Sequence, residues 1–335
     1  MDYLLLLVGF GLLIAGANYF VEGSSNIATL LKVPPMIIGL TIVAFGTGSP
    51  EATVSIIAAL NGSAGVSVGN VIGSNVFNTT LVIGMTAIIL AVQVEKETLR
   101  KQIPFTLLAS VALLVLVGDV QLQGDAFGVL TRGDGVVLLL FFGIFLYYLF
   151  EVAREGRAEG SVAERAADSG QEGSRKEAVT SGTKGRSSWS KNILFTVAGL
   201  AAIIYGGHLV VQKSTNIALA WGMSETLVGL TIVSIGTSLP ELVTSITAAL
   251  KKQNDIAVGN IIGSNIFNIL FVLGVSAVIF PLQVESGLMI DILIVIALTV
   301  LLFIVSRTQY RVGRIEGSLL VLSYIVYMVY VVIRG

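Results

Sequence analysis

Long apolar runs alternate with short polar segments along almost the whole chain. A helix needs about 20 apolar residues to cross the hydrocarbon core of a bilayer. Runs of that kind predict ten membrane-spanning helices, near residues 3–21, 34–60, 66–92, 103–118, 135–150, 192–211, 226–250, 256–281, 288–306 and 317–333. The pattern therefore predicts an all-α integral membrane protein.

The ten predicted spans form two groups of five, separated by a polar segment. Residues 1–150 hold the first group and residues 192–335 hold the second. The segment between them, residues 151–191, is rich in Gly, Ser, Ala and charged residues and cannot bury enough apolar surface to fold alone. We expect it to be a flexible, solvated linker.

The two groups repeat at an offset of 190 residues. Gly39–Leu60 reads GLTIVAFGTGSPEATVSIIAAL and Gly229–Leu250 reads GLTIVSIGTSLPELVTSITAAL, while VGNVIGSNVFN at Val68–Asn78 returns as VGNIIGSNIFN at Val258–Asn268. Because an odd number of spans separates equivalent points, the copies are expected to cross the membrane in opposite directions. This is the inverted-repeat arrangement of secondary transporters, in which broken helices meet near the midplane.

Composition and charge narrow the function and the topology. The chain is 54% hydrophobic and 12% charged, with a net charge of -1, no cysteine and one histidine, which argues against nucleic-acid binding, transition-metal chemistry and a cofactor.

With the amino terminus outside, the inner loops carry 17 of the 20 Lys and Arg residues. Without the linker, 9 of these residues lie inside and 3 lie outside. Positive charge favours the cytoplasmic side, so we expect both termini outside and the linker in the cytoplasm.

Two acidic residues, Glu51 and Glu241, fall in the middle of apolar runs, and each follows a proline. An ionised carboxylate at this depth costs several kcal/mol unless it is paired, hydrated or bound to a cation. No Lys or Arg lies in these runs. A protonated, hydrogen-bonded glutamate is the alternative, but two of them at repeat-equivalent positions favour a cation site.

The residues around the two glutamates offer further oxygen ligands. Proline and glycine in Gly46–Glu51 and Gly236–Glu241 are expected to break the helix, and backbone carbonyls freed in a membrane must line a cavity or meet a ligand. Polar side chains also recur every four residues, and each set can share a helix face. These sets are Thr47, Glu51 and Ser55; Thr237, Glu241 and Ser245; Asn70, Ser74 and Asn78; and Asn260, Ser264 and Asn268.

All of these candidate ligands are oxygens, which suits hard cations. Calcium accepts six to eight oxygens in flexible geometry, whereas magnesium retains its waters. An empty, doubly charged, dehydrated site is penalised, so the site must be filled before it reorients. This electrostatic argument favours an antiporter over an uncoupled pathway. The single histidine, His208, lies in an apolar run and is expected to be packed or hydrogen bonded rather than functional.

At these motifs the chain resembles the cation/calcium antiporter superfamily, specifically prokaryotic sodium/calcium exchangers with two alpha-repeats. The resemblance covers both repeats and the linker. It implies exchange of Ca²⁺ for Na⁺ by alternating access in the plasma (inner) membrane of a prokaryote, without an obligate protein partner. It also implies calcium ligands at Glu51, Glu241, Thr47 and Thr237, and sodium or shared ligands at Ala44, Ser74, Asn78, Ser234, Ser238, Ser264 and Asn268.

Several residues depart from the family pattern. Gly48 stands where the first-repeat turn of the family usually has serine, so one sodium site is expected to have lost a hydroxyl or moved. Ser234 replaces a frequent alanine. Asn268 stands where potassium-dependent relatives tend to carry aspartate, and the GTG and GTS turns differ from the GNA turn of proton-coupled relatives, which favours sodium as the counter-ion.

Three other functions remain as alternatives. A proton-coupled Ca²⁺ antiporter would use the same ligands. A passive cation channel would too, although an inverted repeat argues against it. An intramembrane hydrolase would need a nucleophile with a base or paired acids, and it would leave the hydroxyl and amide ligands unexplained.

Overall fold

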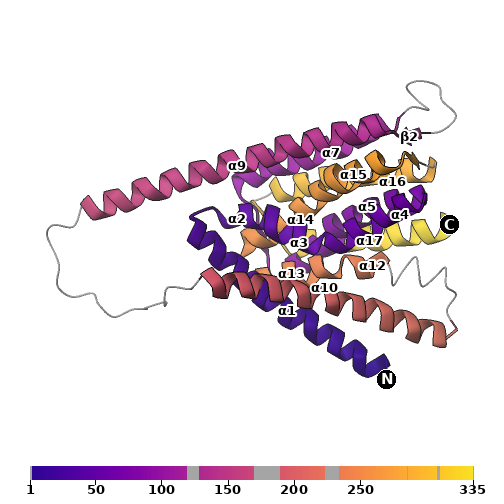
Figure 1. The fold of residues 1–335 in the computed structure, drawn as a ribbon, viewed down its shortest axis with the longest axis horizontal. Coiled ribbons are helices and arrows are strands. Elements are labelled where there is room, and N and C mark those ends of the chain that lie inside the picture. Colours follow the sequence, from indigo (N-terminus) through magenta and orange to yellow (C-terminus); the bar gives the residue numbers. More distant parts are fainter. Residues whose placement is uncertain are drawn as a thin grey trace.

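The structure is a computed structural model, and it describes residues 2–118, 128–169, 189–222, 234–284, 286–307 and 310–334, excluding the side chains of residues 156–169, 234 and 286. Helices dominate it (Figure 1). In the first half they are α1 (Asp2–Leu31), α2 (Pro35–Ile38), η1 (Gly39–Val43), α3 (Ala44–Thr47), α4 (Ser49–Leu60), α5 (Ala64–Phe77), η2 (Asn78–Val82), α6 (Ile83–Ile89), η3 (Thr98–Gln102), α7 (Ile103–Leu116) and α9 (Arg132–Ser169). In the second half they are α10 (Trp189–Ala220), α12 (Ser234–Thr237), α13 (Leu239–Leu250), α14 (Asn254–Ile266), η5 (Phe267–Val272), α15 (Leu273–Ile279), α16 (Ser286–Arg307) and α17 (Arg314–Arg334).

Most of the predicted spans are present as long apolar helices. Within the described residues, eight helical segments are long and apolar enough to cross a membrane, and the bent pair Pro35–Thr47 and Ser49–Leu60 raises the number to nine. The predicted span 226–250 is seen only as α12 and α13, because residues 223–233 lie outside the described part of the chain. The count of ten therefore stays a prediction.

The predicted linker is described only at its two ends. Helix α9 continues to Ser169, well past residue 151, and α10 begins at Trp189. Residues 170–188 lie outside the described residues, so the expected flexible loop also stays a prediction.

The breaks in the two glutamate helices occur where the sequence places proline. Helices α3 and α4 meet at Gly48 (φ −77°, ψ 1°), and the two parts of this span are bent by 50°. In the second half, α12 and α13 meet at Ser238 (φ −95°, ψ 6°). Pro50 and Pro240 follow these breaks in the first turn of α4 and α13, where a missing N–H costs little.

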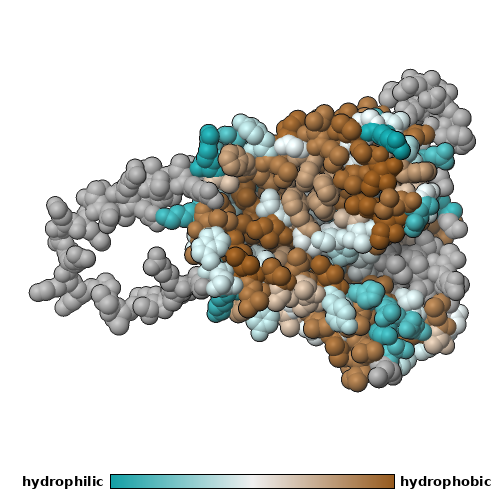
Figure 2. Space-filling model, in the orientation of Figure 1, coloured by the Kyte–Doolittle hydropathy of each residue, from teal (hydrophilic) through white to brown (hydrophobic). Residues whose placement is uncertain are grey.

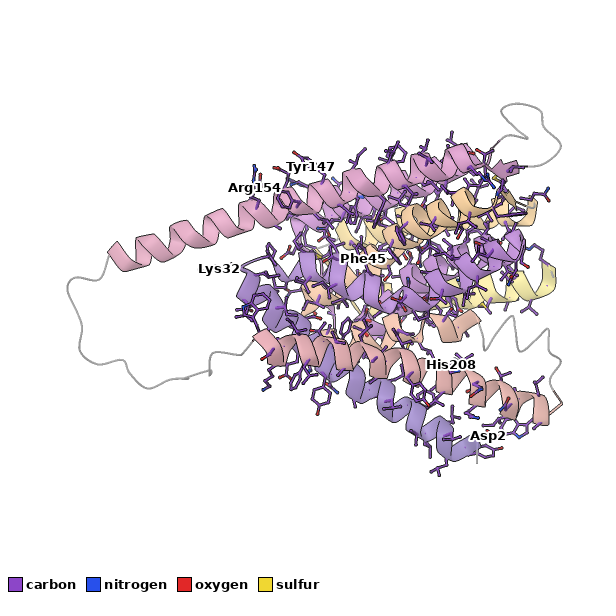
Figure 3. All side chains as sticks on the ribbon, viewed as in Figure 1. Asp2, Lys32, Phe45, Tyr147, Arg154 and His208 are labelled. Atoms are coloured by element: carbon purple, nitrogen blue, oxygen red, sulfur yellow. The ribbon has the colours of Figure 1, made fainter. Side chains whose placement is uncertain are left out.

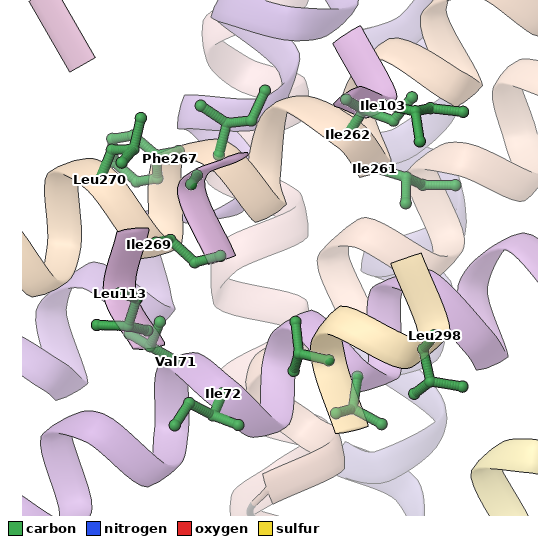
Figure 4. Packing of buried hydrophobic residues seen from close by; sticks show 14 of the residues in the cluster. Val71, Ile72, Ile103, Leu113, Ile261, Ile262, Phe267, Ile269, Leu270 and Leu298 are labelled. Carbon is green, nitrogen blue, oxygen red and sulfur yellow. The ribbon is translucent and has the colours of Figure 1, made fainter. Parts of the chain in front are cut away.

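The centre of the bundle consists of the spans that follow the two broken helices. In Ala64–Ile89 and Asn254–Ile279, 72% and 83% of the residues in the apolar window are buried, against 33% in α1 and 17% in α17. Figure 4 shows the apolar packing around Ile261, Ile262 and Phe267. The polar residues on these two spans are thus held inside protein rather than against lipid.

Helices α1 and α10 pack along each other at one edge of the bundle (Figure 1). Their contact is close because glycines face backbone: a Cβ on Gly16 would lie 2.8 Å from Gly199 O, and a Cβ on Gly206 would lie 2.8 Å from Gly9 O. Small residues at such a crossing let helix backbones approach in a membrane. Gly9 and Gly199, like Gly16 and Gly206, are 190 residues apart, so the two contacts are related by the sequence repeat.

Two short antiparallel pairs of strands also follow the repeat. Strand β1 (Val92–Gln93) pairs with β4 (Arg311–Val312), with Gln93 opposite Arg311, and β3 (Leu282–Val284) pairs with β2 (Gly128–Leu130), with Gln283 opposite Val129. Each strand after a central span therefore pairs with a strand from the other half of the chain.

The described surface has polar residues toward its ends. In Figure 1 both termini lie at one end of the bundle, opposite the ends of α9 and α10 that flank residues 170–188. Figure 2 shows a brown hydrophobic band across the middle of this face, with teal residues gathered toward the two ends. This distribution suits a bundle surrounded by lipid at its middle.

Candidate functional site

Glu51 and Glu241 occupy the same position in the two broken helices. Each lies in the first turn, as the third residue of α4 or α13, and each is 0% exposed. The N–H groups at a helix N-terminus carry partial positive charge, which favours a carboxylate there. The two carboxylates also lie close enough to repel each other when both are ionised. The fold therefore brings two negative charges together in the buried middle of the bundle.

An asparagine on the following span holds each glutamate helix in place. The bonds are equivalent in the two halves: Asn70 Nδ2 donates to Ser55 Oγ (2.9 Å) and Glu51 O (3.2 Å), and Asn260 Nδ2 donates to Ser245 Oγ (2.9 Å) and Glu241 O (3.4 Å). The repeated polar stripes of the sequence thus lie side by side. Ser55 and Ser245 join helices through these bonds.

Two further bonds connect the first half to the second. The Thr47 hydroxyl, which is fully buried, lies 2.9 Å from Asn260 Oδ1 and 3.0 Å from Val43 O. The Ser264 hydroxyl donates to Ala44 O at 3.4 Å. Predicted ligands from opposite halves are therefore neighbours, as one shared site requires.

The surroundings of the two carboxylates differ. The Ser238 hydroxyl lies 2.8 Å from Glu51 Oε1 and 3.2 Å from Ser74 Oγ. Neither carboxylate oxygen of Glu241 has a hydrogen bond of good geometry to a described residue. The Thr47 hydroxyl lies near Glu241, but its bonds are those to Val43 and Asn260. The position equivalent to Ser238 is Gly48, which has no hydroxyl to offer.

Several buried polar atoms at the site have no partner among the described residues. They are Glu51 Oε2, both carboxylate oxygens of Glu241, and both amide atoms of Asn78 and of Asn268. A buried polar atom left without a partner costs about 1–3 kcal/mol, and more when it is charged. Bound cations would satisfy the oxygens in this set, so the donor chemistry of the site fits a hard cation.

The two unpartnered amides lie at irregular turns of the central spans. Asn78 begins η2 and Asn268 is the second residue of η5, both of which are π-helical. Such turns are rare and are frequent at functional sites. Both asparagines are 0% exposed. Each of these unpartnered side-chain amides thus lies, fully buried, in a π-helical turn of a central span.

Two cavities border Thr237, a predicted ligand that is partly exposed. One has a volume of about 340 Å³ and is lined in part by Asn70, Thr237 and Arg334. The other has a volume of about 410 Å³ and is lined in part by Pro50, Thr237 and His208. Thr237 therefore has space on two sides, whereas its equivalent Thr47 is buried.

His208 differs from its expected role as a packed residue. Its side chain is exposed and lines the second cavity on α10 (Figure 3). Among the described residues no group of three or more His, Cys, Asp or Glu side chains is placed to hold a metal ion. Any cation at the site must accordingly use hydroxyl, amide and backbone oxygens besides the two carboxylates.

The structure brings together most of the predicted ligands. Ala44, Thr47, Ser74, Ser238, Ser264 and the two glutamates are buried and linked as described above. The Ser234 side chain lies outside the described residues.

The sequence prediction missed Asn75 and Asn265, which are both nearly fully buried. Asn265 Nδ2 donates to Thr79 Oγ1 at 2.8 Å, and the Asn75 side chain has no partner in the described chain. Their 190-residue spacing was the available signal.

Comparison with known proteins gives a consistent result over the whole chain. The profile of the family described as sodium/calcium exchanger protein matches residues 1–151 and 191–333. The chain is 37% identical over 325 residues to the putative antiporter CaxA of Alkalimonas amylolytica, which covers 96% of this chain and 95% of the relative. It is 32% identical over 345 residues to the sodium/calcium exchanger MaX1 of Methanosarcina acetivorans, covering 98% of each. The fold matches that of the sodium-calcium exchanger NCX_Mj with a TM-score of 0.78, 30% identity and 98% coverage of both chains.

Proposed function

Because the chain belongs to the sodium/calcium exchanger family, whose members are membrane transporters and not enzymes, we propose that it exchanges Ca²⁺ for Na⁺ at the site around Glu51 and Glu241. Family membership confirms the resemblance seen in the repeated motifs and removes the hydrolase alternative. It supports cation/Ca²⁺ antiport. The choice of Na⁺ as the counter-ion is our proposal.

The observation that carries the proposal is the pair of buried carboxylates without a basic partner. Neither Glu51 nor Glu241 forms an ion pair with a described Lys, Arg or His, and three of their four carboxylate oxygens lack a hydrogen-bond donor. Two buried negative charges in this setting are stable only with protons or cations. A divalent cation neutralises both at once, and it finds additional oxygens on Thr47 and Thr237.

We assign the ligands in two groups. Ca²⁺ is held by Glu51 and Glu241 with Thr47 and Thr237. Na⁺ is held by hydroxyl, amide and backbone oxygens around the same carboxylates, which are those of Ala44, Ser74, Asn78, Ser234, Ser238, Ser264 and Asn268. Because both groups include oxygens next to the same two charges, occupancy by one ion excludes the other, and this competition produces exchange.

The equivalent contacts in the two halves support inverted repeats and a shared site at the midplane. The asparagine bonds, the glycine contacts of α1 with α10 and the two strand pairs all occur twice at repeat-related positions. We place both termini outside and the linker, residues 151–191, in the cytoplasm, in line with the Lys and Arg count. Sliding or rocking of α1 and α10, which lie at the edge of the bundle, past the central spans would open the site to each side in turn.

The test is ion flux in proteoliposomes that contain the purified protein. Vesicles loaded with Na⁺ and diluted into Na⁺-free buffer should accumulate radioactive Ca²⁺, and Glu51→Gln or Glu241→Gln should reduce this uptake at least about 100-fold, since each removes one of two charges that bind the ion. Glu97→Gln serves as the control, because the Glu97 side chain is 54% exposed and lies outside the site. Calcium uptake that does not depend on the Na⁺ gradient would overturn the proposal.

The same vesicles separate the remaining alternatives. In a proton-coupled antiporter, a pH gradient without Na⁺ would drive Ca²⁺ uptake. In a passive channel, Ca²⁺ would move and carry current with no counter-ion on the opposite side. We expect neither flux, and varying K⁺ independently should leave the Na⁺-driven uptake unchanged.

A further inference from the structure

A partly buried ion pair lines the smaller of the two cavities. Arg334 on α17 makes a bidentate contact with Asp291 on α16, with Nη1 3.0 Å from Oδ1 and Nη2 2.8 Å from Oδ2. The Asp291 side chain is 3% exposed and that of Arg334 is 32% exposed, so the arginine covers the aspartate on the accessible side. The Arg334 Nη1 also donates to Gly287 O at 2.8 Å, which fixes the arginine over the aspartate.

This pair shares its cavity with residues of the cation site. The cavity, of about 340 Å³, is lined by Asp291 and Arg334 and also by Asn70 and Thr237. Asn70 donates to the backbone carbonyl of Glu51, and Thr237 belongs to the turn before Glu241. A cation that reaches the glutamates through this cavity therefore passes a carboxylate and a guanidinium on the way.

Among the described residues of the first half, this pair has no counterpart. The residue 190 positions before Asp291 is Lys101, which bonds instead to Glu97 on its own helix, with both side chains about half exposed. A buried carboxylate in a membrane protein is costly unless it is paired, so Asp291 and the arginine that neutralises it call for a role. Asp291 lies in the second turn of α16 and Arg334 is the last residue of α17, so both charges lie toward one end of the bundle and act on one side of the transport pathway.

We propose that the Asp291–Arg334 pair acts as a charge filter, which means that it holds this access cavity near zero net charge. The net charge of the cavity sets how strongly divalent cations are attracted relative to monovalent cations. The inference rests on the proposed transport of cations. An unpaired Asp291 would retain a cation before it reached the site, and an unpaired Arg334 would repel it. The electrostatic energy of Ca²⁺ in a given potential is twice that of Na⁺. Any net charge left in the cavity should therefore change the half-saturating concentrations of the two ions by different factors.

The test compares variants that leave opposite charges. Asp291→Asn leaves the guanidinium, and the half-saturating concentration at this side should rise roughly threefold for Na⁺ and roughly ninefold for Ca²⁺. Arg334→Gln leaves the carboxylate, and both concentrations should fall by the same factors. The double variant is neutral and should return to within about twofold of the wild type. Glu97→Gln, which removes one charge from the exposed pair of the first half, should change neither value.

A second measurement does not depend on how these variants fold. The chain has no cysteine, so Met328→Cys, on the wall of the same cavity, gives a single labelling site. A trimethylammonium methanethiosulfonate should weaken Ca²⁺ binding by about the square of its effect on Na⁺, and a sulfonate reagent should strengthen both. The charge filter would be overturned if labelling changed Na⁺ and Ca²⁺ binding by equal factors, or if the positive and negative reagents changed binding in the same direction. Na⁺-driven uptake by the wild-type protein is measured first, so that failure of the transport proposal is recognised separately.

Discussion

The two halves of the chain place their glutamates alike but surround them differently. Glu51 and Glu241 each follow a helix break, and each helix is tied to the next span by an asparagine. Three residues before the glutamate, however, the second half has Ser238 and the first half has Gly48. Ser238 reaches across to Glu51, while Glu241 receives no equivalent hydroxyl. The backbone plan is therefore symmetric, and the ligand set is not.

The first spans of the two halves, α1 and α10, keep the repeat symmetry closely at the positions where their backbones pack together. Gly16 faces the backbone of Gly199, and Gly206 faces that of Gly9. At Gly16, Gly199 and Gly206 a Cβ would lie less than 3 Å from backbone of the other helix. The repeat is thus retained where these helices touch and at most of the proposed ion ligands, and it diverges at single ligand positions such as Gly48 and Ser238. The following predictions test that distinction, beginning with the largest effect.

Breaking the symmetric contact should disrupt the protein. In Gly16→Val or Gly199→Val, the new side chain meets backbone atoms less than 3 Å away, and we expect a loss of about 3 kcal/mol or more in the free energy of unfolding. Gly11→Val is the matched control, because no described atom lies within 4 Å of its Cβ position on the same helix. Unfolding in mixed SDS and mild detergent measures the difference. Equal stability of the three variants would contradict the close contact of α1 with α10.

Removing the hydroxyl of the second half should weaken sodium binding. Ser238→Ala removes the hydroxyl that lies 2.8 Å from Glu51 Oε1, and with it one of the oxygens proposed to hold Na⁺; polar contacts to charged groups contribute about 1.5–3 kcal/mol. We expect the half-saturating Na⁺ concentration for Ca²⁺ uptake to rise about tenfold or more, with a smaller change for Ca²⁺. The control is Ser318→Ala, whose exposed hydroxyl bonds to its own helix. An unchanged Na⁺ dependence would show that Ser238 only supports the fold.

Adding a hydroxyl to the first half should have the opposite and smaller effect. In Gly48→Ser, the Cβ would lie 3.0 Å from Ala44 O and 3.2 Å from Phe267 Cδ1, so the ring must move by a few tenths of an ångström. We expect the half-saturating Na⁺ concentration to fall about threefold, since the steric cost offsets part of the new bond. Gly48→Ala has the same steric cost without the hydroxyl. If both variants behave alike, the missing hydroxyl is not what separates the two halves.

Much of the fold could be predicted from the sequence because membrane spans have a simple signature. Runs of apolar residues predicted all of the long helices that the structure describes, and proline with glycine predicted the break at Gly48. The helical backbone up to Ser169 was not predicted, because composition cannot distinguish a polar helix from a loop. The short strands were also missed, since two or three residues carry no periodicity.

The site was predictable to the extent that the repeat marks it. Glu51 and Glu241 stand out because carboxylates are rare in apolar runs. Asn75 and Asn265 do not, because asparagines are common and only packing shows which face they occupy. The Asp291–Arg334 pair could not be found, since its two residues lie in different helices and each is close to the end of an apolar run. Contacts between distant segments require the folded structure.

The turns after the spans give a final comparison of the two halves. Lys32 and Gly222 are 190 residues apart, as are Gly62 and Lys252, and all four have positive φ, at 54°, 87°, 74° and 60°. Only glycine adopts this conformation without strain. The two lysines fall on the side that we propose to be cytoplasmic, and the two glycines fall on the other. Each turn on the proposed cytoplasmic side thus has a lysine in a strained, left-handed conformation, whereas each outer turn has a glycine without that strain.

Relieving that strain should stabilise the protein slightly. In Lys252→Gly, removal of the left-handed strain of about 1–2 kcal/mol is partly offset by the greater chain entropy of glycine, so we expect a gain of about 0.5–1 kcal/mol. Gly62→Ala, at the equivalent turn, should lose about 1 kcal/mol. Unfolding in SDS and mild detergent measures both, and Lys252→Gln controls for the lost charge, because it keeps a side chain at the same positive φ. A loss of stability in Lys252→Gly would mean that the charge contributes more to the fold than the backbone strain costs.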